Sequence, residues 1–379
     1  MRKKERYHTV KAWARTERML AFALLTALII LVLIGTYKLQ PVRTVEYRSD
    51  EINASTTLPL VPQLRLPVLD TALYDAKMES IVHIISDATT SPRRFSSSTR
   101  STSTKRLWPV DAAYPNYGAL LPQHRIVAFY GNFYSTKMGI LGENDATTTK
   151  RKLAAEVAKW EAADPSTPVI PAIDYIAITA QLAPGFDGKY RARMPGTEIQ
   201  KAIDMAREIH GVVFLDLQVG LSDLKAELPL LKEYLKQPDV HLSIDPEFSM
   251  QTSGKRPGTV IGTEDAAMLN WCAEYLAGIV RENHLPPKVL VVHRFTKDMV
   301  THYKRITPLP EVQIVIDMDG WGEPKKKFGT YDRVITKEPV QFAGFKLFYK
   351  NDLFAPSTHM LTPKELLELT PQPMYIQYQ

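Results

Sequence analysis

The chain has 379 residues, 45% hydrophobic and 23% charged, which is the composition of an ordinary globular protein and excludes a fully disordered one. Its formal net charge is +6, but the first 18 residues supply nearly all of this excess, so the charge indicates no nucleic-acid partner. Cys272 is the single cysteine, which excludes an intramolecular disulfide.

The first predicted element is a membrane-spanning helix at residues 19–37. This segment carries no charged residue and approaches the roughly 20 apolar residues that span a bilayer. Residues 1–18 are basic and predict a cytoplasmic tail, because positively charged flanks stay inside. A cleaved signal peptide is the alternative, but no small-x-small cleavage site follows Gly35. We therefore expect a single-pass anchor in the cell membrane, with the remaining mass extracytoplasmic.

Residues 38–107 predict a flexible linker, since they show weak periodicity and include a stretch rich in Ser and Thr at 87–106. Within this linker, apolar residues at helical spacing predict a short helix over 70–85, capped by Asp70. No helical pattern follows the last predicted strand. We therefore expect the 70–85 helix to complete the wall of the domain beside that strand.

Residues 108–379 predict a (β/α)8 TIM barrel. Amphipathic stretches at 148–163, 197–210 and 264–283 alternate with short apolar runs, which implies parallel strands covered by helices. A doubly wound open sheet is the alternative, but no G-x-G-x-x-G turn follows the first run. Eight runs match the barrel's strand number; they are 125–133, 168–177, 211–220, 240–250, 288–295, 312–322, 342–349 and 374–379.

Acidic residues recur where these predicted strands end. Residues two apart on a strand point to the same side, so several pairs are expected to face the barrel mouth together. The pairs are Asp216 with Gln218, Asp245 with Glu247, and Asp317 with Asp319, while Asp174 and His293 end two further strands. TIM-barrel enzymes place their active sites at this end of the strands.

Crowded carboxyl groups suit the cleavage of a glycosidic bond, which needs one protonated and one ionised carboxyl. We assign Glu247 as general acid/base and Asp317 or Asp216 as nucleophile or water-activating base. Lys346 suits either a Schiff base or, more simply, an ion pair with a nearby Asp, and the basic run 325–327 is interpreted as a solvated face. The predicted substrate-binding residues are Asp174, Asp245, Asp319, His293, Tyr130, Asn132, Gln218, Trp321, Lys346 and Tyr349.

Other chemistries find less support in the sequence. It contains no H-E-x-x-H, no G-x-S-x-G and no paired C-x-x-C motif. No two histidines fall at ligand spacing on adjacent strand ends. We therefore expect no cofactor and no bound metal.

The motifs AFYGNFYSTKMGILGE, LDLQVG, IDPEF, VVHRF, IDMDGWG and GFKLFYKND occur in this order. Together they resemble a group of uncharacterised extracytoplasmic bacterial proteins that look like glycoside-hydrolase-type TIM barrels, over residues 114–379. The resemblance implies the barrel fold and a carbohydrate substrate. The Asp245–Pro–Glu247 sequence is similar to the Asp-x-Glu pairs of several glycosidase families. It departs from the chitinase-like Asp-x-Asp-x-Glu pattern, because Ser243 stands at the earlier Asp position.

The resulting prediction is a membrane-anchored glycoside-hydrolase-like protein that acts on a cell-envelope or extracellular polysaccharide, with a cell-wall glycan as its partner. Two alternatives remain open. One is a barrel that binds glycans without cleaving them. The other is a metal-dependent hydrolase that uses Asp216, Asp317 and His293.

Overall fold

The computed structural model describes residues 69–83 and 106–379. Within these ranges, no helix combines the length and apolar character needed to cross a membrane. The predicted cytoplasmic tail, the anchor at 19–37 and most of the predicted linker lie outside the described residues. The membrane anchor therefore stays a prediction.

The described chain forms a closed barrel of eight parallel strands. Strand β1 pairs with β11 on one side and with β2 on the other, so the sheet has no open edge within the barrel. The barrel is confirmed, and the open-sheet alternative is wrong. The barrel strands are β1 (Arg125–Gly131), β2 (Val169–Ala180), β4 (Val212–Leu217), β5 (Val240–Ile244), β7 (Lys288–Arg294), β9 (Val312–Met318), β10 (Phe342–Leu347) and β11 (Tyr375–Tyr378).

Three short strands lie outside the barrel. Strand β3 (Arg191–Arg193) pairs antiparallel with the end of β2. Strands β6 (Glu264–Asp265) and β8 (Val300–Thr301) form a separate parallel pair. These additions extend the loops at the carboxyl end of the barrel, where β2, β5 and β7 finish.

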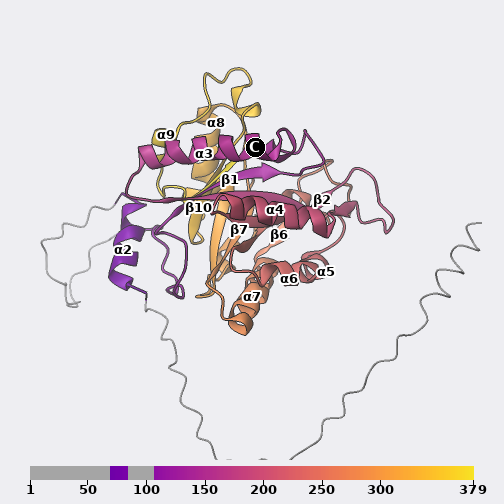
Figure 1. Ribbon diagram of the computed structural model, residues 1–379, viewed down its shortest axis with the longest axis horizontal. Coiled ribbons are helices and arrows are strands. Elements are labelled where there is room, and N and C mark those ends of the chain that lie inside the picture. Colours follow the sequence, from indigo (N-terminus) through magenta and orange to yellow (C-terminus); the bar gives the residue numbers. More distant parts are fainter. Residues whose placement is uncertain (1–68, 84–105) are drawn as a thin grey trace, which may run out of the picture. The chain divides into compact units, whose positions relative to one another are not determined.

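An incomplete ring of helices covers the barrel (Figure 1). Between β7 and β9 the described chain has no α-helix, only β8 and the 3-10 turn η4 (Tyr303–Arg305). The wall is therefore thinner there than a regular (β/α)8 barrel predicts. The helices of the ring are α3 (Ala146–Ala163), α4 (Gly196–Glu208), α5 (Leu224–Glu227), α6 (Lys232–Leu235), α7 (Ala266–Asn283), α8 (Pro324–Tyr331) and α9 (Pro363–Leu367).

Aspartates set the starts of the two longest helices. The Asp145 side chain accepts from the backbone N–H of Thr148 at the start of α3, 2.9 Å away. Asp265 accepts in the same way from Ala267 at the start of α7. Each carboxylate satisfies an N–H that has no partner inside the helix. These caps fix where each helix leaves the loops at the barrel mouth.

Helix α3 seals the barrel where its first and last strands meet. The fully buried Trp160 of α3 donates from Nε1 to the hydroxyl of Tyr378 on β11, 3.1 Å away. The ring of Tyr378 also contacts Phe129 of β1 edge to face. One tryptophan thus bridges the helix and the closing pair of strands.

The helix predicted over 70–85 spans Thr71–Ser80 as α2, with Asp70 accepting from the Leu73 N–H at its start. It does not complete the barrel wall. The Lys77 ammonium donates to the Thr167 hydroxyl ahead of β2, and the Ile81 carbonyl accepts from the Gln372 N–H ahead of β11. Helix α2 therefore lies at the amino ends of these strands, and Trp160 of α3 covers the position that we had assigned to it.

We expect Trp160→Ala to lower the free energy of unfolding by about 3–5 kcal/mol, because it leaves a large cavity and removes the hydrogen bond from the indole to the Tyr378 hydroxyl. Guanidinium unfolding followed by circular dichroism measures the change. Trp321→Ala is the matched control, since Trp321 is 46% exposed and its removal should cost about 0.5 kcal/mol or less. Equal losses from the two variants would contradict the role of Trp160 in barrel closure.

Candidate active site

Strand register gathers polar side chains inside the carboxyl half of the barrel. Tyr130 of β1 lies beside Asp174 of β2, and His293 of β7 lies beside Asp317 of β9. Paired residues of adjacent parallel strands point to the same side of the sheet, which here is the interior. The four side chains are buried, as are Asp216, Ser243, Lys346 and Gln377 on the other strands.

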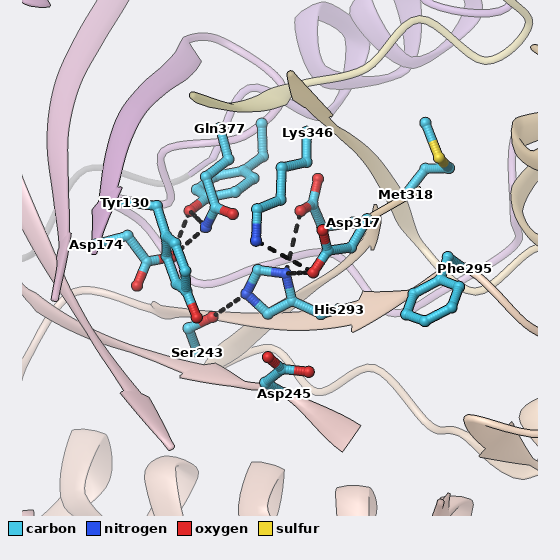
Figure 2. Close-up of polar contacts among 12 residues, drawn as sticks. Tyr130, Asp174, Ser243, Asp245, His293, Phe295, Asp317, Met318, Lys346 and Gln377 are labelled. Atoms are coloured by element: carbon cyan, nitrogen blue, oxygen red, sulfur yellow. Dashed lines mark hydrogen bonds and ion pairs between the residues drawn. The ribbon is translucent and has the colours of Figure 1, made fainter. Parts of the chain in front are cut away.

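His293 is the centre of this polar cluster (Figure 2). Its Nδ1 atom lies 3.3 Å from Oδ2 of Asp317 and 3.2 Å from Oδ2 of Asp319. On its other side, Nε2 lies 3.1 Å from the hydroxyl of Ser243. Burial lowers the pKa of His293, but the two carboxylates outweigh that effect and raise the pKa well above its usual range. The imidazole is therefore a fixed cation near neutral pH.

Lys346 is the second cation of the cluster. Its Nζ atom lies 3.1 Å from Oδ2 of Asp319 and 4.0 Å from the ring centroid of Tyr130. Burial lowers the pKa of Lys346, but Asp319 and its acidic neighbours reverse the effect, so the net shift is upward. A Schiff base needs a neutral amine. Of the two roles considered for Lys346, this geometry fits the ion pair.

The deepest carboxyl groups are held by neutral donors. The hydroxyl of Tyr375 and the amide of Gln377 donate to Oδ2 of Asp174 over 2.6 and 2.7 Å. The hydroxyl of Tyr130 donates to Asp216 over 3.0 Å. Burial, followed by repulsion from Asp216, raises the pKa of Asp174 to about 7. Burial also raises the pKa values of Asp216 and Asp317. The floor of the site therefore contains carboxyl groups that resist ionisation.

Gly344 of β10 makes room for Asp317. A Cβ atom at this position would lie 2.6 Å from Oδ1 of Asp317, which is closer than real contacts allow. The glycine lies next to Asp317 in the register of β10 and β9. Glycine inside a strand often marks such a close approach, so the GFKLF sequence carried a signal that our sequence analysis missed.

A cavity of about 960 Å³ opens above this cluster at the barrel mouth. Seven of the predicted site residues line it, namely Tyr130, Gln218, Asp245, Glu247, Asp319, Trp321 and Lys346. Asp174, Asp216, His293 and Asp317 do not line it, because they lie deeper along the same strands and are fully buried. The two-residue alternation placed the side chains on the correct face without giving their depth.

Two carboxyl groups of the cavity carry opposite pKa shifts. Glu247, on the turn η3 (Pro246–Phe248) after β5, has no hydrogen-bond partner for its carboxyl among the described residues. Burial and repulsion from Asp319 raise the pKa of Glu247 to about 7. Burial opposes ionisation of Asp319 too, but Lys346 and His293 hold its pKa below the usual value. Near neutral pH, Glu247 is therefore partly protonated while Asp319 is ionised.

Asp245 supports the turn that carries Glu247. Its Oδ1 atom accepts from the backbone N–H of Glu247 over 3.1 Å. The amide of Gln218 lies 3.4 Å from its Oδ2 and also donates to the hydroxyl of Tyr130. Burial, with repulsion from Glu247, raises the pKa of Asp245 well above its usual range. Asp245 and Gln218 therefore position the cavity wall through neutral hydrogen bonds.

Two predicted substrate-binding residues lie away from the cavity. The amide of Asn132 donates to the carbonyl of Ile176 and braces the loop after β1. Tyr349 donates to Glu156 over 3.0 Å and stacks on Tyr378 outside the barrel. We therefore remove Asn132 and Tyr349 from the candidate site. Phe348, the residue before Tyr349, lines the cavity instead.

Segments beyond the strand ends contribute further cavity residues that were not among the predicted site residues. They include Lys137 and Phe295 from loops, Lys326 from helix α8 and Arg333 from the helical turn that follows it. The run 325–327 is not a uniformly solvated face. Lys326 lines the cavity, whereas Lys327 is buried and forms a 2.6 Å ion pair with Asp352. The run of basic residues does not predict this difference between Lys326 and Lys327, because the helical turn of α8 decides which side each lysine faces.

Among the described residues, no group of three or more His, Cys, Asp or Glu side chains has an arrangement that could hold a metal ion. The alternative of a metal-dependent hydrolase therefore finds no support at Asp216, Asp317 and His293.

No model of a known protein family matches the chain, and neither does any curated protein. The barrel is the part of the resemblance to glycoside-hydrolase-type proteins that the structure supports.

We expect Gly344→Ala to lower the free energy of unfolding by about 1–3 kcal/mol, because the new methyl group displaces the Asp317 carboxyl. Gly278→Ala is the control with the opposite sign. Gly278 lies within helix α7 with nothing close to an added Cβ, and alanine favours a helix by about 0.5–1 kcal/mol. Chemical unfolding of the two variants measures both changes. A neutral Gly344→Ala variant would contradict the packing of Asp317 against this strand.

Proposed function

We propose that the barrel is a glycoside-hydrolase-like enzyme that cleaves a polysaccharide at its carboxyl mouth. The observation that carries this proposal is the presence of Glu247 and Asp319 in one cavity, with opposite pKa shifts. Glycoside hydrolysis needs such a pair, one carboxyl group to donate a proton and another to act as nucleophile or base.

In the proposed reaction, Glu247 protonates the oxygen of the leaving sugar. Asp319 attacks the anomeric carbon or removes a proton from the attacking water. The cations Lys346 and His293 keep Asp319 ionised within a cavity wall that would otherwise favour its neutral form. If Asp319 attacks, Glu247 as a carboxylate then takes a proton from a water molecule, whose oxygen attacks the anomeric carbon and releases the Asp319 carboxylate. If Asp319 instead accepts the proton of the attacking water, that proton returns to Glu247 by exchange with solvent.

This assignment moves the second catalytic role from Asp317 or Asp216 to Asp319. Asp317 and Asp216 are fully buried beneath the cavity, and burial raises their pKa values. Asp319 lies two residues further along β9 and reaches the cavity. Asp317 instead lies beside His293, which pairs with Asp319, so its role is to position that cation.

Aromatic side chains of the mouth provide faces for sugar rings. Trp321 is exposed at the lip of the cavity and meets the ring of Phe354 edge to face. Phe348 lines the same cavity from the end of β10. Flat apolar faces of this kind pack against the C–H faces of a pyranose while its hydroxyl groups remain free for hydrogen bonds. A polymer chain passing Trp321 would reach the Glu247 carboxyl.

A barrel that binds glycans without cleaving them is the second candidate. Asp319 has two cationic neighbours, and such pairing reduces the nucleophilicity of a carboxylate. We also propose that residues 19–37 anchor the chain in the cell membrane, with the barrel outside the cytoplasm. The partner is then a cell-envelope or extracellular glycan.

We expect Glu247→Gln to reduce kcat by roughly 10²–10⁴, because the amide cannot donate the proton. Release of reducing ends from purified envelope glycans by the full-length chain measures the rate. Glu264→Gln is the matched control. Glu264 is a buried glutamate whose pKa is raised by burial to about 7, and it does not line the cavity. Unchanged turnover in Glu247→Gln would refute the acid role, and tight binding without release would favour the second candidate.

We also expect the rate of the wild-type chain to fall as pH rises through about 7, since Glu247 is active in its protonated form. Asp319→Asn should abolish most turnover at every pH, because the amide can neither attack nor accept a proton. Rate profiles between pH 4 and 9 test both points. A rate that increases across pH 7 would contradict Glu247 as the acid.

A further inference from the structure

The cavity contains cationic side chains that the proposed reaction does not use. Lys137 comes from the loop after β1, Lys326 from helix α8, and Arg333 from the π-helical turn η5 (Asp332–Thr336). The loop after β1 is far in the sequence from α8 and η5, which follow each other directly, and the barrel brings these segments to one rim.

None of the three cations forms an ion pair within the described part of the chain. The ammonium of Lys326 lies 4.5 Å from the ring centroid of Trp321. Arg333 donates to the hydroxyl of Thr330, which is neutral. Only the backbone N–H of Lys137 has a described partner, the hydroxyl of Ser135. Other lysines of the surface, such as Lys236 and Lys337, have acidic partners. The rim cations are therefore available to a ligand.

The acidic groups of the cavity do not neutralise this rim. Asp319 is paired with Lys346, so its charge is already balanced. Asp245 is buried and bonded to the neutral amide of Gln218, and it favours its protonated form. Glu247 is partly protonated near neutral pH. The lining therefore carries a net positive charge.

A further loop adds to this charge. Pro257 and Gly258 line the cavity, and Lys255 and Arg256 immediately precede them. Both basic side chains are exposed and have no ion-pair partner among the described residues. A concave surface with one sign of charge concentrates ligands of the opposite sign.

We propose that the cavity accepts a polysaccharide whose sugars carry negatively charged groups, held by Lys326 and Arg333 beside Trp321. This inference rests on the proposed function only in taking the ligand to be a glycan. Carboxylate and sulfate groups share the chemistry that these side chains recognise, because guanidinium and ammonium groups donate charge-assisted hydrogen bonds to both. The aromatic ring of Trp321 would pack against the sugar while the adjacent cations contact its anionic substituent.

The test measures binding of matched oligosaccharides to the full-length chain by calorimetry and tryptophan fluorescence. Oligogalacturonate is compared with the same oligosaccharide after chemical reduction of its carboxyl groups, and dextran sulfate is compared with dextran. We expect the charged member of at least one pair to bind at least tenfold more tightly, and its affinity to fall as salt concentration rises. The pair that shows the difference identifies carboxylate or sulfate as the recognised group.

The double variant Lys326→Ala with Arg333→Ala should weaken binding of that charged probe by about tenfold, since it removes two charge-assisted contacts to the anionic group. Lys225→Ala is the control. Lys225 also lies over a tryptophan, Trp271, but on the outer helices and away from the cavity.

Equal affinity for charged and neutral probes, failure of both charged probes to bind, or full affinity in the double variant would overturn the inference. Cleavage is scored separately. Selective binding without cleavage would support the anionic ligand and refute the hydrolase. Cleavage of a neutral glycan alone would support the hydrolase and overturn the anionic ligand.

Discussion

Charge balance inside a closed barrel is the constraint on which the candidate site depends. Transfer of an ion from water into a protein interior costs several kcal/mol, which only close and well-bonded counter-charges offset. Asp319 meets this condition because Lys346 and His293 both lie within ion-pair distance of its Oδ2 atom. Asp216 and Asp317 have only His293 within that distance, and burial outweighs this single cation and raises their pKa values. The barrel therefore selects one ionised carboxylate among several.

The strands and their inward faces follow directly from the sequence. Apolar runs with acidic residues two apart predicted that Asp317 and Asp319 share one face, and both lie near His293 in the structure. This prediction works because side chains alternate along every strand whatever its neighbours are. The ion pair of Lys346 with a nearby Asp was the simpler of the two roles considered for it, and Asp319 is that partner.

The alternation of side chains along a strand did not predict how deep each side chain lies within the barrel. The stagger between neighbouring strands decides whether a strand-end residue meets solvent or lies under another side chain, and no local run encodes that stagger. Asp216 and Asp317 were consequently assigned catalytic roles although they lie below the cavity. The sequence likewise did not predict which residues beyond the strand ends line the cavity, since Lys137 and Arg333 reach the mouth only in the closed fold.

The seam between β1 and β11 has a consequence for how the chain folds. It joins Ile126 to Tyr375, so the barrel has contacts of very long sequence separation. Folds with many non-local contacts fold slowly, because chain entropy is lost before those contacts form. During synthesis β11 emerges last, and until then β1 and β10 are unpaired edges that can join strands of other molecules. Trp160, already folded on α3, would present its ring to the arriving Tyr378 and shorten the search for the closing register.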